Sequence, residues 1–398
     1  MSYKILIIEG DGIGPEVMDS TLTVLSALQE KHGFSLEYEK ENCGDEVKER
    51  TGTAVPDAAI DAFKKADSAL KGPVGETVAD FIAAFRQAFD LYVNIRPAFS
   101  YPAICPPALR PDINFVIIRE NSEGFYKTAE LDANAALEEL PEGGELAKLK
   151  DSLESILAED TGEAILSTGV FTQKGGERIM RFAFEYEQMR VEQGLSRGYP
   201  AWGEKEKAGY VRLVHKKNIY RRAHEIYERE FLKEAAGYPD FHADTRYIDA
   251  MCIDLLRWPH AYSTIVTTNM FGDILSDLTG QMAGGIGMTA GTNFNPETRK
   301  GMFEPTHGSA PDIVGTGKAD PIGMYHSARM MLEFLGLAND DDRLKDAALD
   351  FNKAIEFMLS SDKPENMPLE VNGHEKGLNT HDVGERIAEI ITTQAWEQ

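Results

Sequence analysis

A short strand that runs directly into a helix places two aspartates where they can act together. Residues 262–267 are rich in β-branched and aromatic side chains, and the chain then passes through Gly272 into a helical pattern. Asp273 and Asp277 are four residues apart and therefore lie on one face of that helix. A hard divalent cation bound by oxygen ligands would offset the repulsion between the two carboxylates. The alternative is a solvated acidic helix start, which the helix dipole favours and which is the commoner meaning of an isolated pair.

The N-terminal residues also combine a strand with a helix and indicate an α/β fold. Residues 3–8 form an apolar run, a glycine-rich turn follows, and an amphipathic helix begins after the turn. The turn does not match the dinucleotide-binding pattern GxGxxG, because Pro15 occupies one of its positions and the glycine spacing fails after Gly14. A strand, a tight turn and a helix are nevertheless the start of an α/β unit.

The charge of the chain restricts its ligands. The 398 residues suit one large or two ordinary domains, and 66 acidic against 41 basic residues give a formal net charge of -25. Such a field repels phosphates, so we expect neither a nucleic acid nor an anionic membrane as a partner. An anionic small ligand would need a local cluster of arginine and lysine.

The cysteines and the N-terminus favour a cytoplasmic protein. Cys43, Cys105 and Cys252 are too few and too scattered for a disulfide framework or a zinc site. The N-terminal residues lead into a strand rather than a signal peptide. No run approaches the roughly 18 apolar residues that a membrane span requires.

Three arginines follow apolar segments and predict a site for an anion. Arg86 lies in a helical segment of residues 78–90, and Arg96 and Arg119 follow two further apolar runs. Because ligands of α/β proteins bind where strands end, and because the planar guanidinium matches a carboxylate, we expect the three to converge. Each arginine taken alone fits equally well as a surface side chain at the end of a helix or strand.

Further candidates lie in the second half of the chain. Lys216 follows a strand-like run and is a possible base if its pKa is lowered, or else a solvated lysine. Residues 127–160 are acidic and helix-prone, which suggests an arm or a solvated insert. Residues 303–313 show no regular period and contain His307 and Asp312, as a nucleotide-binding loop does.

Seven motifs, taken in order, give these features a common meaning. They are GDGIGPE at 10–16, NIRP at 94–97, RENSEGFY at 119–126, VHKKN at 214–218, the helix that carries Asp249, TTNMFGDILSD at 267–277 and EPTHGSAPDI at 304–313. In type and order they resemble the β-decarboxylating dehydrogenases, the family of isocitrate, 3-isopropylmalate and tartrate dehydrogenases. The resemblance covers nearly the whole chain, and seven motifs in one order are far more specific than any one of them.

The resemblance implies an α/β, isocitrate/isopropylmalate dehydrogenase-like fold of two domains without a Rossmann unit. Residues 1–98 with 264–398 would form the large cofactor-binding domain, and residues 99–263 the small one. The small domain would carry an arm near 127–208 and would form the contact of a homodimer in which two subunits build each active site.

The resemblance also implies a role for each site residue. Arg86, Arg96 and Arg119 would bind the carboxylates of a malate core. Tyr126 would protonate the enol after carbon dioxide leaves, and Lys216 of the partner subunit would handle the proton of the C2 hydroxyl. Mg²⁺ or Mn²⁺ would be bound by Asp273 and Asp277 with the partner's Asp249, and would stabilise the charge on the C2 oxygen.

Cofactor choice rests on the last motif. NADP-dependent family members tend to have Lys-Tyr where this chain has Asp312-Ile313, and an acidic residue there would repel a 2′-phosphate, so NAD is expected. Asp320 stands where many members have asparagine. The predicted cofactor contacts are Ile13, Asn218, Glu304, His307, Gly308, Ser309, Ala310, Asp312, Ile313 and Asp320.

The helix before Arg86 is expected to read the substituent on the third carbon of the substrate. Isocitrate enzymes share a Ser-x-Asn that would fall at Asp80 and Ile82, and neither residue here can donate to a third carboxylate. Phe81, Ile82 and Phe85 instead resemble the apolar lining of malate, tartrate or alkylmalate enzymes, although they fit an ordinary core equally well. A malate or tartrate type of substrate is therefore favoured.

Alternatives remain open. Isopropylmalate enzymes usually have leucine where this chain has Asn121, and homoisocitrate enzymes tend to add an arginine near Ala83. Isocitrate and homoisocitrate stay as alternative substrates. A non-catalytic regulatory subunit of a heteromeric dehydrogenase is an alternative of another class, but such a subunit is expected to lose site residues that this chain retains.

Overall fold

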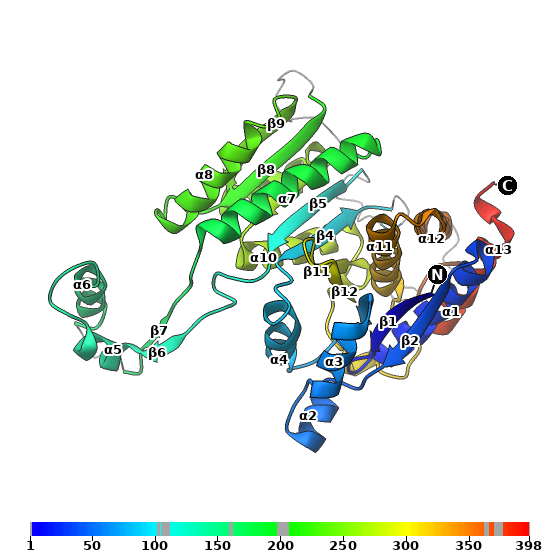
Figure 1. Cartoon of the computed structure of the whole chain (residues 1–398), viewed down its shortest axis with the longest axis horizontal. Coiled ribbons are helices and arrows are strands. Elements are labelled where there is room, and N and C mark those ends of the chain that lie inside the picture. The colour runs from blue at the N-terminus through cyan, green and yellow to red at the C-terminus, as the bar shows by residue number, and fades with distance from the viewer. Residues whose placement is uncertain are drawn as a thin grey trace.

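The computed structural model describes residues 2–101, 104, 112–158, 162–196, 207–361, 366–369 and 377–397. One ten-stranded sheet runs through the molecule in the order β2-β1-β3-β12-β11-β4-β5-β10-β8-β9 (Figure 1). Its strands are β1 (Ser2–Ile8), β2 (Ser35–Lys40), β3 (Ser68–Lys71), β4 (Val93–Phe99), β5 (Asn114–Glu120), β8 (Gly209–His215), β9 (Phe241–Tyr247), β10 (Thr264–Thr267), β11 (Ala290–Asn295) and β12 (Lys300–Pro305).

The sheet is parallel towards both edges and antiparallel in the middle. β2, β1, β3 and β12 are mutually parallel, as are β5, β10, β8 and β9. Between these groups, β11 is antiparallel to β12 and β4, and β4 is antiparallel to β5. β10 lies between β5 and β8, so strands of both predicted domains alternate within one sheet. The division of the chain near residues 98 and 264 stays a prediction.

Helices cover both faces of the sheet. Apolar side chains of one face pack in a single core cluster against α1, α7, α8, α11, α12 and α13. On the opposite face one cluster packs against α3 and α4 and a separate one against α9 and α10. These helices are α1 (Gly14–His32), α3 (Asp57–Lys65), α4 (Val78–Phe81), α7 (Gln173–Glu192), α8 (Ala223–Ala235), α9 (Ile248–Arg257), α10 (Asn269–Ala283), α11 (Ile322–Asn339), α12 (Asp342–Leu359) and α13 (Thr380–Thr393).

The candidate site lies between these two apolar clusters, on the face of the sheet that α3, α4, α9 and α10 cover. There, β4, β5, β11 and β12 each carry at least one polar side chain on this face, since successive side chains of a strand point to opposite faces. These buried polar residues are Asn94, Arg96, Arg119, Asn293 and Glu304. Polar side chains in the middle of a sheet are costly to bury unless they are paired, so their grouping marks a functional surface.

The acidic segment forms an arm that projects from the sheet (Figure 1). Its short strands β6 (Glu130–Asp132) and β7 (Ile165–Ser167) pair antiparallel in a sheet of their own, and α5 (Ala133–Glu139) and α6 (Ala147–Ile156) lie between them in the chain. The remaining elements are α2 (Asp45–Thr51), a π-helix (Ile82–Gln87) and 3₁₀ turns at Pro259–Ala261, Ile286–Met288, Pro311–Ile313 and Ala395–Glu397.

Two local predictions were wrong. Residues 303–305, which were assigned to a loop, end β12, which pairs with β11 and β3. The helix with the two aspartates begins at Asn269, before Gly272. Among the described helices, none is long and apolar enough to cross a membrane.

Candidate active site

Arg119 is buried at the end of β5 and held by the first turns of α10. Its Nε and Nη2 donate to Asn269 Oδ1 at 3.0 and 2.7 Å, and its Nη1 donates to Asp273. A Cβ on Gly272 would lie 2.5 Å from Arg119 Cγ, so this helix approaches the arginine as closely as it does because residue 272 is glycine. Burial lowers the pKa of Arg119 to about 10, against the opposing charge of Asp273, and the guanidinium remains charged at neutral pH.

Arg96 is oriented by a row of buried asparagines. Its Nε donates to Asn94 Oδ1 at 2.6 Å. Asn94 donates in turn to Asn293 Oδ1 at 2.7 Å, which also accepts from Asn121 Nδ2 at 2.9 Å. Of the three guanidinium nitrogens of Arg96, only Nε has a hydrogen-bond partner among the described residues. The two terminal amino groups are therefore left for a ligand. The asparagines thus fix the arginine without neutralising it.

Glu304 connects Arg86 to a buried lysine. Its Oε1 accepts from Arg86 Nη2 at 2.8 Å and from Asn293 Nδ2 at 2.7 Å, and its Oε2 accepts from Lys71 Nζ at 2.6 Å. Burial alone would raise the pKa of this carboxyl, but the charges of Lys71 and Arg86 hold it far below its usual range. Arg86 Nη1 also donates to Asn121 Oδ1 at 3.4 Å. The predicted cofactor contact of Glu304 stays a prediction. The structure places its carboxylate beside Arg86, one of the arginines predicted to bind the substrate.

Asp273, Asp277 and Tyr126 form the acidic side of the same surface. The hydroxyl of Tyr126 donates to Asp273, and the guanidinium carbon of Arg119 lies 4.9 Å from the centre of the Tyr126 ring. Burial opposes ionisation of Asp273, yet the charge of Arg119 and the hydrogen bond from Tyr126 keep its pKa below the usual value. Burial and then the charge of Asp273 raise the pKa of Asp277. A divalent cation between these carboxylates would relieve that repulsion, so the donor set fits the predicted metal.

Lys216 and Asp249 form a pair of their own. Lys216 Nζ contacts Asp249 Oδ1 at 2.6 Å, where β8 ends and α9 begins. The side chain of Asp249 is two thirds exposed. Within the described part of one chain, no hydrogen bond or ion pair joins this pair to Tyr126 or Asp273. Among the described residues, the hydrogen bonds of one subunit therefore form two separate pairs, Tyr126 with Asp273 and Lys216 with Asp249.

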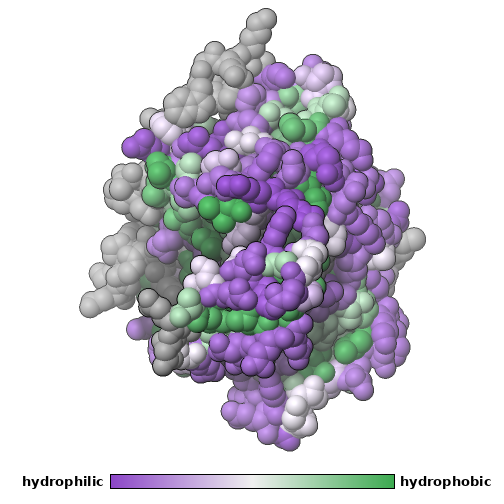
Figure 2. All heavy atoms as spheres, turned by 90° about the vertical axis from the view of Figure 1, so that its left-hand side faces the viewer, coloured by the Kyte–Doolittle hydropathy of each residue, from purple (hydrophilic) through white to green (hydrophobic). Residues whose placement is uncertain are grey.

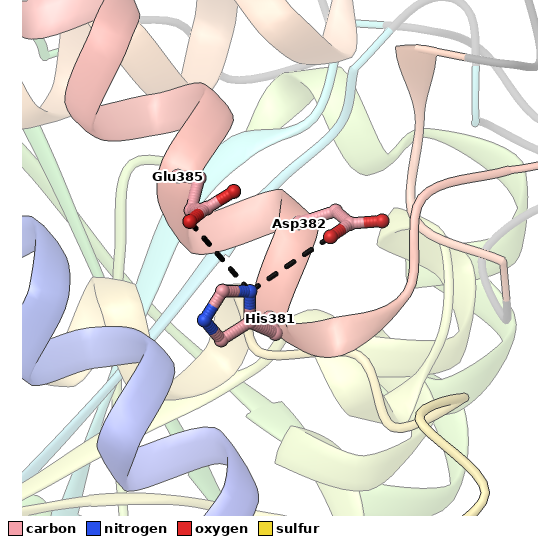
Figure 3. Close-up of side chains that lie close together, drawn as sticks. All are labelled: His381, Asp382 and Glu385. Atoms are coloured by element: carbon pink, nitrogen blue, oxygen red, sulfur yellow. Dashed lines mark ion pairs between the residues drawn. The ribbon is translucent and has the colours of Figure 1, made fainter.

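A second group of potential metal ligands lies far along the chain from Asp273 and Asp277 in sequence. Among the described residues, the group with three close potential ligands is His381, Asp382 and Glu385, at the exposed start of α13 (Figure 3). His381 Nδ1 lies 3.8 Å from Asp382 Oδ1 and 4.0 Å from Glu385 Oε1. Exposed groups of this kind are held by ion pairing and are common without a metal. The predicted site at Asp273 and Asp277 has only two acids from one chain.

The predicted cofactor loop packs against the first turn of the chain. Ile13 N donates to Ser309 O at 3.0 Å, and a Cβ on Gly12 would overlap that same carbonyl oxygen. His307 Nδ1 lies 3.0 Å from Gly308 O, while its buried Nε2 has no hydrogen-bond partner within the part of the chain that the structure describes. A buried donor or acceptor without a partner suits a loop that binds a polar cofactor, so these residues fit the expected NAD.

The remaining cofactor candidates lie around this loop or beyond it. Ala310 adopts the left-handed conformation with φ 42°, and Asp312 is exposed in the 3₁₀ turn Pro311–Ile313. Asp320 Oδ1 accepts from Ile322 N at 3.0 Å and so satisfies the first turn of α11. Asn218 is exposed in the turn after β8.

The predicted apolar wall divides into core and surface. Phe81 and Phe85 are buried in the cluster beneath α3, with Phe63 and Phe85 in edge-to-face contact at 5.4 Å. Ile82, the first residue of the π-helix, is half-buried. Asp80 forms a surface ion pair with Lys48 at 2.8 Å. The core interpretation therefore holds for the two phenylalanines, and Ile82 alone stays a candidate wall residue.

Sequence reasoning missed the residues that support the arginines. Asn94 and Asn269 accept hydrogen bonds from Arg96 and Arg119. Lys71 and Asn293 donate to Glu304, which accepts from Arg86. The sequence held one signal for Lys71, which ends the short buried strand β3. A charge at such a position is costly to bury unless it is paired, so a partner such as Glu304 could have been expected.

The chain is similar to known enzymes over nearly its whole length. A model of the isocitrate/isopropylmalate dehydrogenase family matches residues 4–387. The chain is 36% identical over 389 residues to the 3-isopropylmalate/3-methylmalate dehydrogenase of Methanocaldococcus jannaschii, covering 98% of this chain and 99% of that one. It is 33% identical to the decarboxylating D-malate dehydrogenase of Escherichia coli, over 90% of this chain and 92% of that one.

A solved structure shows the same fold. The crystal structure of isocitrate dehydrogenase from Methylococcus capsulatus superimposes with a TM-score of 0.79 at 31% identity, covering 98% of this chain and 99% of that one. The predicted α/β fold class is confirmed by this likeness and by the large central sheet.

Proposed function

We propose, from the premise that this chain belongs to the isocitrate/isopropylmalate dehydrogenase family, that it catalyses the NAD- and metal-dependent oxidative decarboxylation of a malate-core 2-hydroxy acid. The observation that carries the proposal is the buried surface on which three arginines face two aspartates and a tyrosine. The arginines offset the charge of a dicarboxylate inside an acidic protein, and the aspartates suit a hard cation.

Each residue of the chain has a separate task in this reaction. Arg86, Arg96 and Arg119 bind and orient the two carboxylates, so that the C2 hydrogen faces the cofactor. Tyr126 holds a proton on its hydroxyl, because burial and then the hydrogen bond to Asp273 raise its pKa, and it delivers that proton to C3. Asp273 and Asp277 would hold the metal, which would stabilise negative charge on the C2 oxygen, and NAD would supply the hydride acceptor. Lys216 of the partner subunit would take the proton of the C2 hydroxyl.

We also infer that the enzyme is a homodimer with shared active sites. Among the described residues, Lys216 and Asp249 pair with each other and form no hydrogen bond or ion pair with Tyr126 or Asp273, which suits a site completed by a second subunit. Exposed apolar residues lie on α9 and α10 and on the arm, and the view from the side of the arm shows apolar patches among hydrophilic side chains (Figure 2). They include Ile253, Leu256 and Ile274 on the helices and Leu131, Ile156 and Ile165 on the arm.

NAD is preferred over NADP in this proposal. Asp312 is exposed in the cofactor loop, where its carboxylate can accept from the ribose hydroxyls and would repel a 2′-phosphate. Ile313 beside it offers no positive charge.

The favoured substrates carry a hydrogen, a hydroxyl or a small alkyl group on the third carbon. Asp80 is paired with Lys48 and Ile82 is apolar, so the helix before Arg86 has no donor for a third carboxylate. The named relatives from Methanocaldococcus jannaschii and Escherichia coli act on isopropylmalate or methylmalate and on D-malate, which agrees with this choice. Isocitrate and homoisocitrate are the alternatives.

The test is steady-state formation of NADH with Mn²⁺, comparing kcat/KM for (R)-malate, tartrate, 3-methylmalate, 3-isopropylmalate, isocitrate and homoisocitrate. A lead for malate, tartrate or an alkylmalate supports the proposal. A lead for isocitrate or homoisocitrate overturns the assignment of Ile82, and turnover of none of them overturns the function.

A further inference from the structure

A cavity of about 190 Å³ lies between α7 and α11, two helices on the same face of the sheet (Figure 1). We call it the back cavity. Its walls are Phe182, Tyr186 and Met189 of α7 and Met330, Glu333, Phe334 and Leu337 of α11, and its floor is Ile95, Thr292, Phe294 and Phe303.

The back cavity lies directly behind the candidate active site. Ile95 faces the cavity and Arg96, the next residue of β4, faces the site. The same alternation holds for Asn293 with Phe294 on β11 and for Phe303 with Glu304 on β12. Because successive side chains of a strand point to opposite faces, three strands carry both the cavity floor and the arginine support.

Five of the eleven lining residues are aromatic, and four of the others are aliphatic. The rings of Phe182 and Phe294 meet edge to face at 5.2 Å, and Phe334 contacts Phe294 at 5.7 Å and Phe303 at 5.6 Å. The one charged side chain of the lining, Glu333, is paired with Arg329 at 3.1 Å. An aromatic ring gains additional energy from edge-to-face contacts with such neighbours, whereas a charged ligand would lose its hydration without a free partner.

We propose that the back cavity binds a small uncharged aromatic molecule and that its occupancy changes the affinity of the active site for its substrate. An apolar cavity of about 150 Å³ is enough to hold benzene, so 190 Å³ accommodates one substituted ring but not a peptide helix. The ligand would touch α7 of the predicted small domain and α11 of the predicted large domain at once. It would therefore link the two helices and also contact β4 and β12, the strands that carry Arg96 and Glu304.

The first experiment titrates the whole enzyme with bromobenzene and follows binding by ligand-observed NMR. Leu337→Glu places a carboxylate at the cavity mouth, where residue 337 is 51% exposed, so the fold is not challenged. Leu349→Glu on α12, at a leucine that is 59% exposed and outside the cavity, is the matched control. We expect Leu337→Glu to weaken binding by about fivefold or more, because the ligand would have to desolvate the new charge, and the control to bind as the parent protein does.

Two results would overturn the binding site: an absence of bromobenzene binding to the parent protein, or equal weakening in both variants. Crystals soaked with bromobenzene give a second answer, because the anomalous signal of bromine locates the ring. Density at Phe294 and Phe334 supports the site, and density elsewhere alone overturns it.

The second experiment measures the coupling between the two sites. The dissociation constant of bromobenzene is compared without and with a saturating hydroxy acid and Mn²⁺, where a change of about fivefold in either direction is expected. Binding without any change overturns the role as an effector site. This part rests on the proposed function, whereas the titration of the unliganded enzyme does not, so failure of the one is distinguishable from failure of the other.

Discussion

Gly272 and Arg119 are so close that any side chain at position 272 would displace the arginine. A Cβ there would lie 2.5 Å from Arg119 Cγ and 2.7 Å from its Cβ, distances that real carbon atoms do not adopt. The glycine therefore allows α10 to bring Asn269 and Asp273 onto the guanidinium, which connects helix packing with the position of Arg119.

Replacing this glycine is expected to damage the site more than the fold. Gly272→Ala should lower kcat/KM by about tenfold or more, because even a small displacement of Arg119 disturbs both a carboxylate contact and Asp273. Gly143→Ala on the arm, where a Cβ meets no atom within 4 Å, is the control and should leave kcat/KM unchanged. An unchanged kcat/KM in Gly272→Ala would show that the close contact relaxes without consequence.

The buried pair of Lys71 and Glu304 gives a prediction about stability. Lys71→Met removes the partner at 2.6 Å from a carboxylate that is 7% exposed, which should lower the free energy of unfolding by about 3 to 5 kcal/mol. Lys48→Met breaks the exposed pair with Asp80 and should cost less than about 1 kcal/mol. Urea denaturation of both variants measures the difference, and equal losses would contradict the role assigned to the buried pair.

If residues 303–313 bind the cofactor as expected, substitutions there should change the preference for NAD over NADP. Asp312→Lys combined with Ile313→Tyr should raise the ratio of kcat/KM for NADP to that for NAD by about tenfold or more, because a positive charge replaces a negative one near the 2′ position. Asp346→Lys on α12 makes the same charge change at another exposed position and should leave the ratio as it is. Kinetics with both cofactors measure this, and a ratio that moves equally in both variants would point to overall charge instead.

The apolar runs of the sequence were sufficient to predict the inner strands of the sheet but not its polar edge strand. Apolar runs predicted β1, β5, β8 and β10, whose buried side chains leave little ambiguity. β9, with the sequence FHADTRY, lies at an edge of the sheet and carries partly exposed polar residues, so it lacked that signal.

The site shows the same limit. The convergence of Arg86, Arg96 and Arg119 was expected from the ends of apolar segments, but only Arg119 lies at the end of a strand. Arg96 lies in the middle of β4 and Arg86 in the π-helix. The asparagines beneath them could not be predicted, since Asn94 and Asn293 are 199 residues apart and only the pairing of β4 with β11 brings them together.

A buried carboxyl beside the site predicts a pH dependence of stability. Burial raises the pKa of Glu120 to about 7, although Ser122 and the backbone of Glu123 donate hydrogen bonds to it. Because the folded protein holds this proton more tightly than the unfolded chain, its contribution to stability is complete below about pH 4.5 and is lost as the pH rises to about 7. Unfolding free energies of the parent and of Glu120→Gln across this range should therefore fall more steeply in the parent, and parallel curves would contradict the shift.

Shared active sites predict that two inactive variants restore each other. Lys216→Ala should abolish turnover while the fold and dimer remain, because its side chain contacts Asp249 at the surface and supports no core residue. Lys217→Ala, which removes the neighbouring pair with Glu228, is the control and should retain activity. Tyr126→Phe should also be inactive, since it loses the hydroxyl that donates to Asp273.

When the two inactive variants are unfolded together and refolded, about half of the dimers are mixed, and each mixed dimer contains one site with both native residues if the residues come from different subunits. The mixture should then regain about a quarter of the parent activity. If Lys216 and Tyr126 act within one subunit, every site in every dimer lacks one of them, and the mixture stays inactive. Recovered activity thus distinguishes a site built by two subunits from one built by a single chain, without requiring that the substrate be the physiological one.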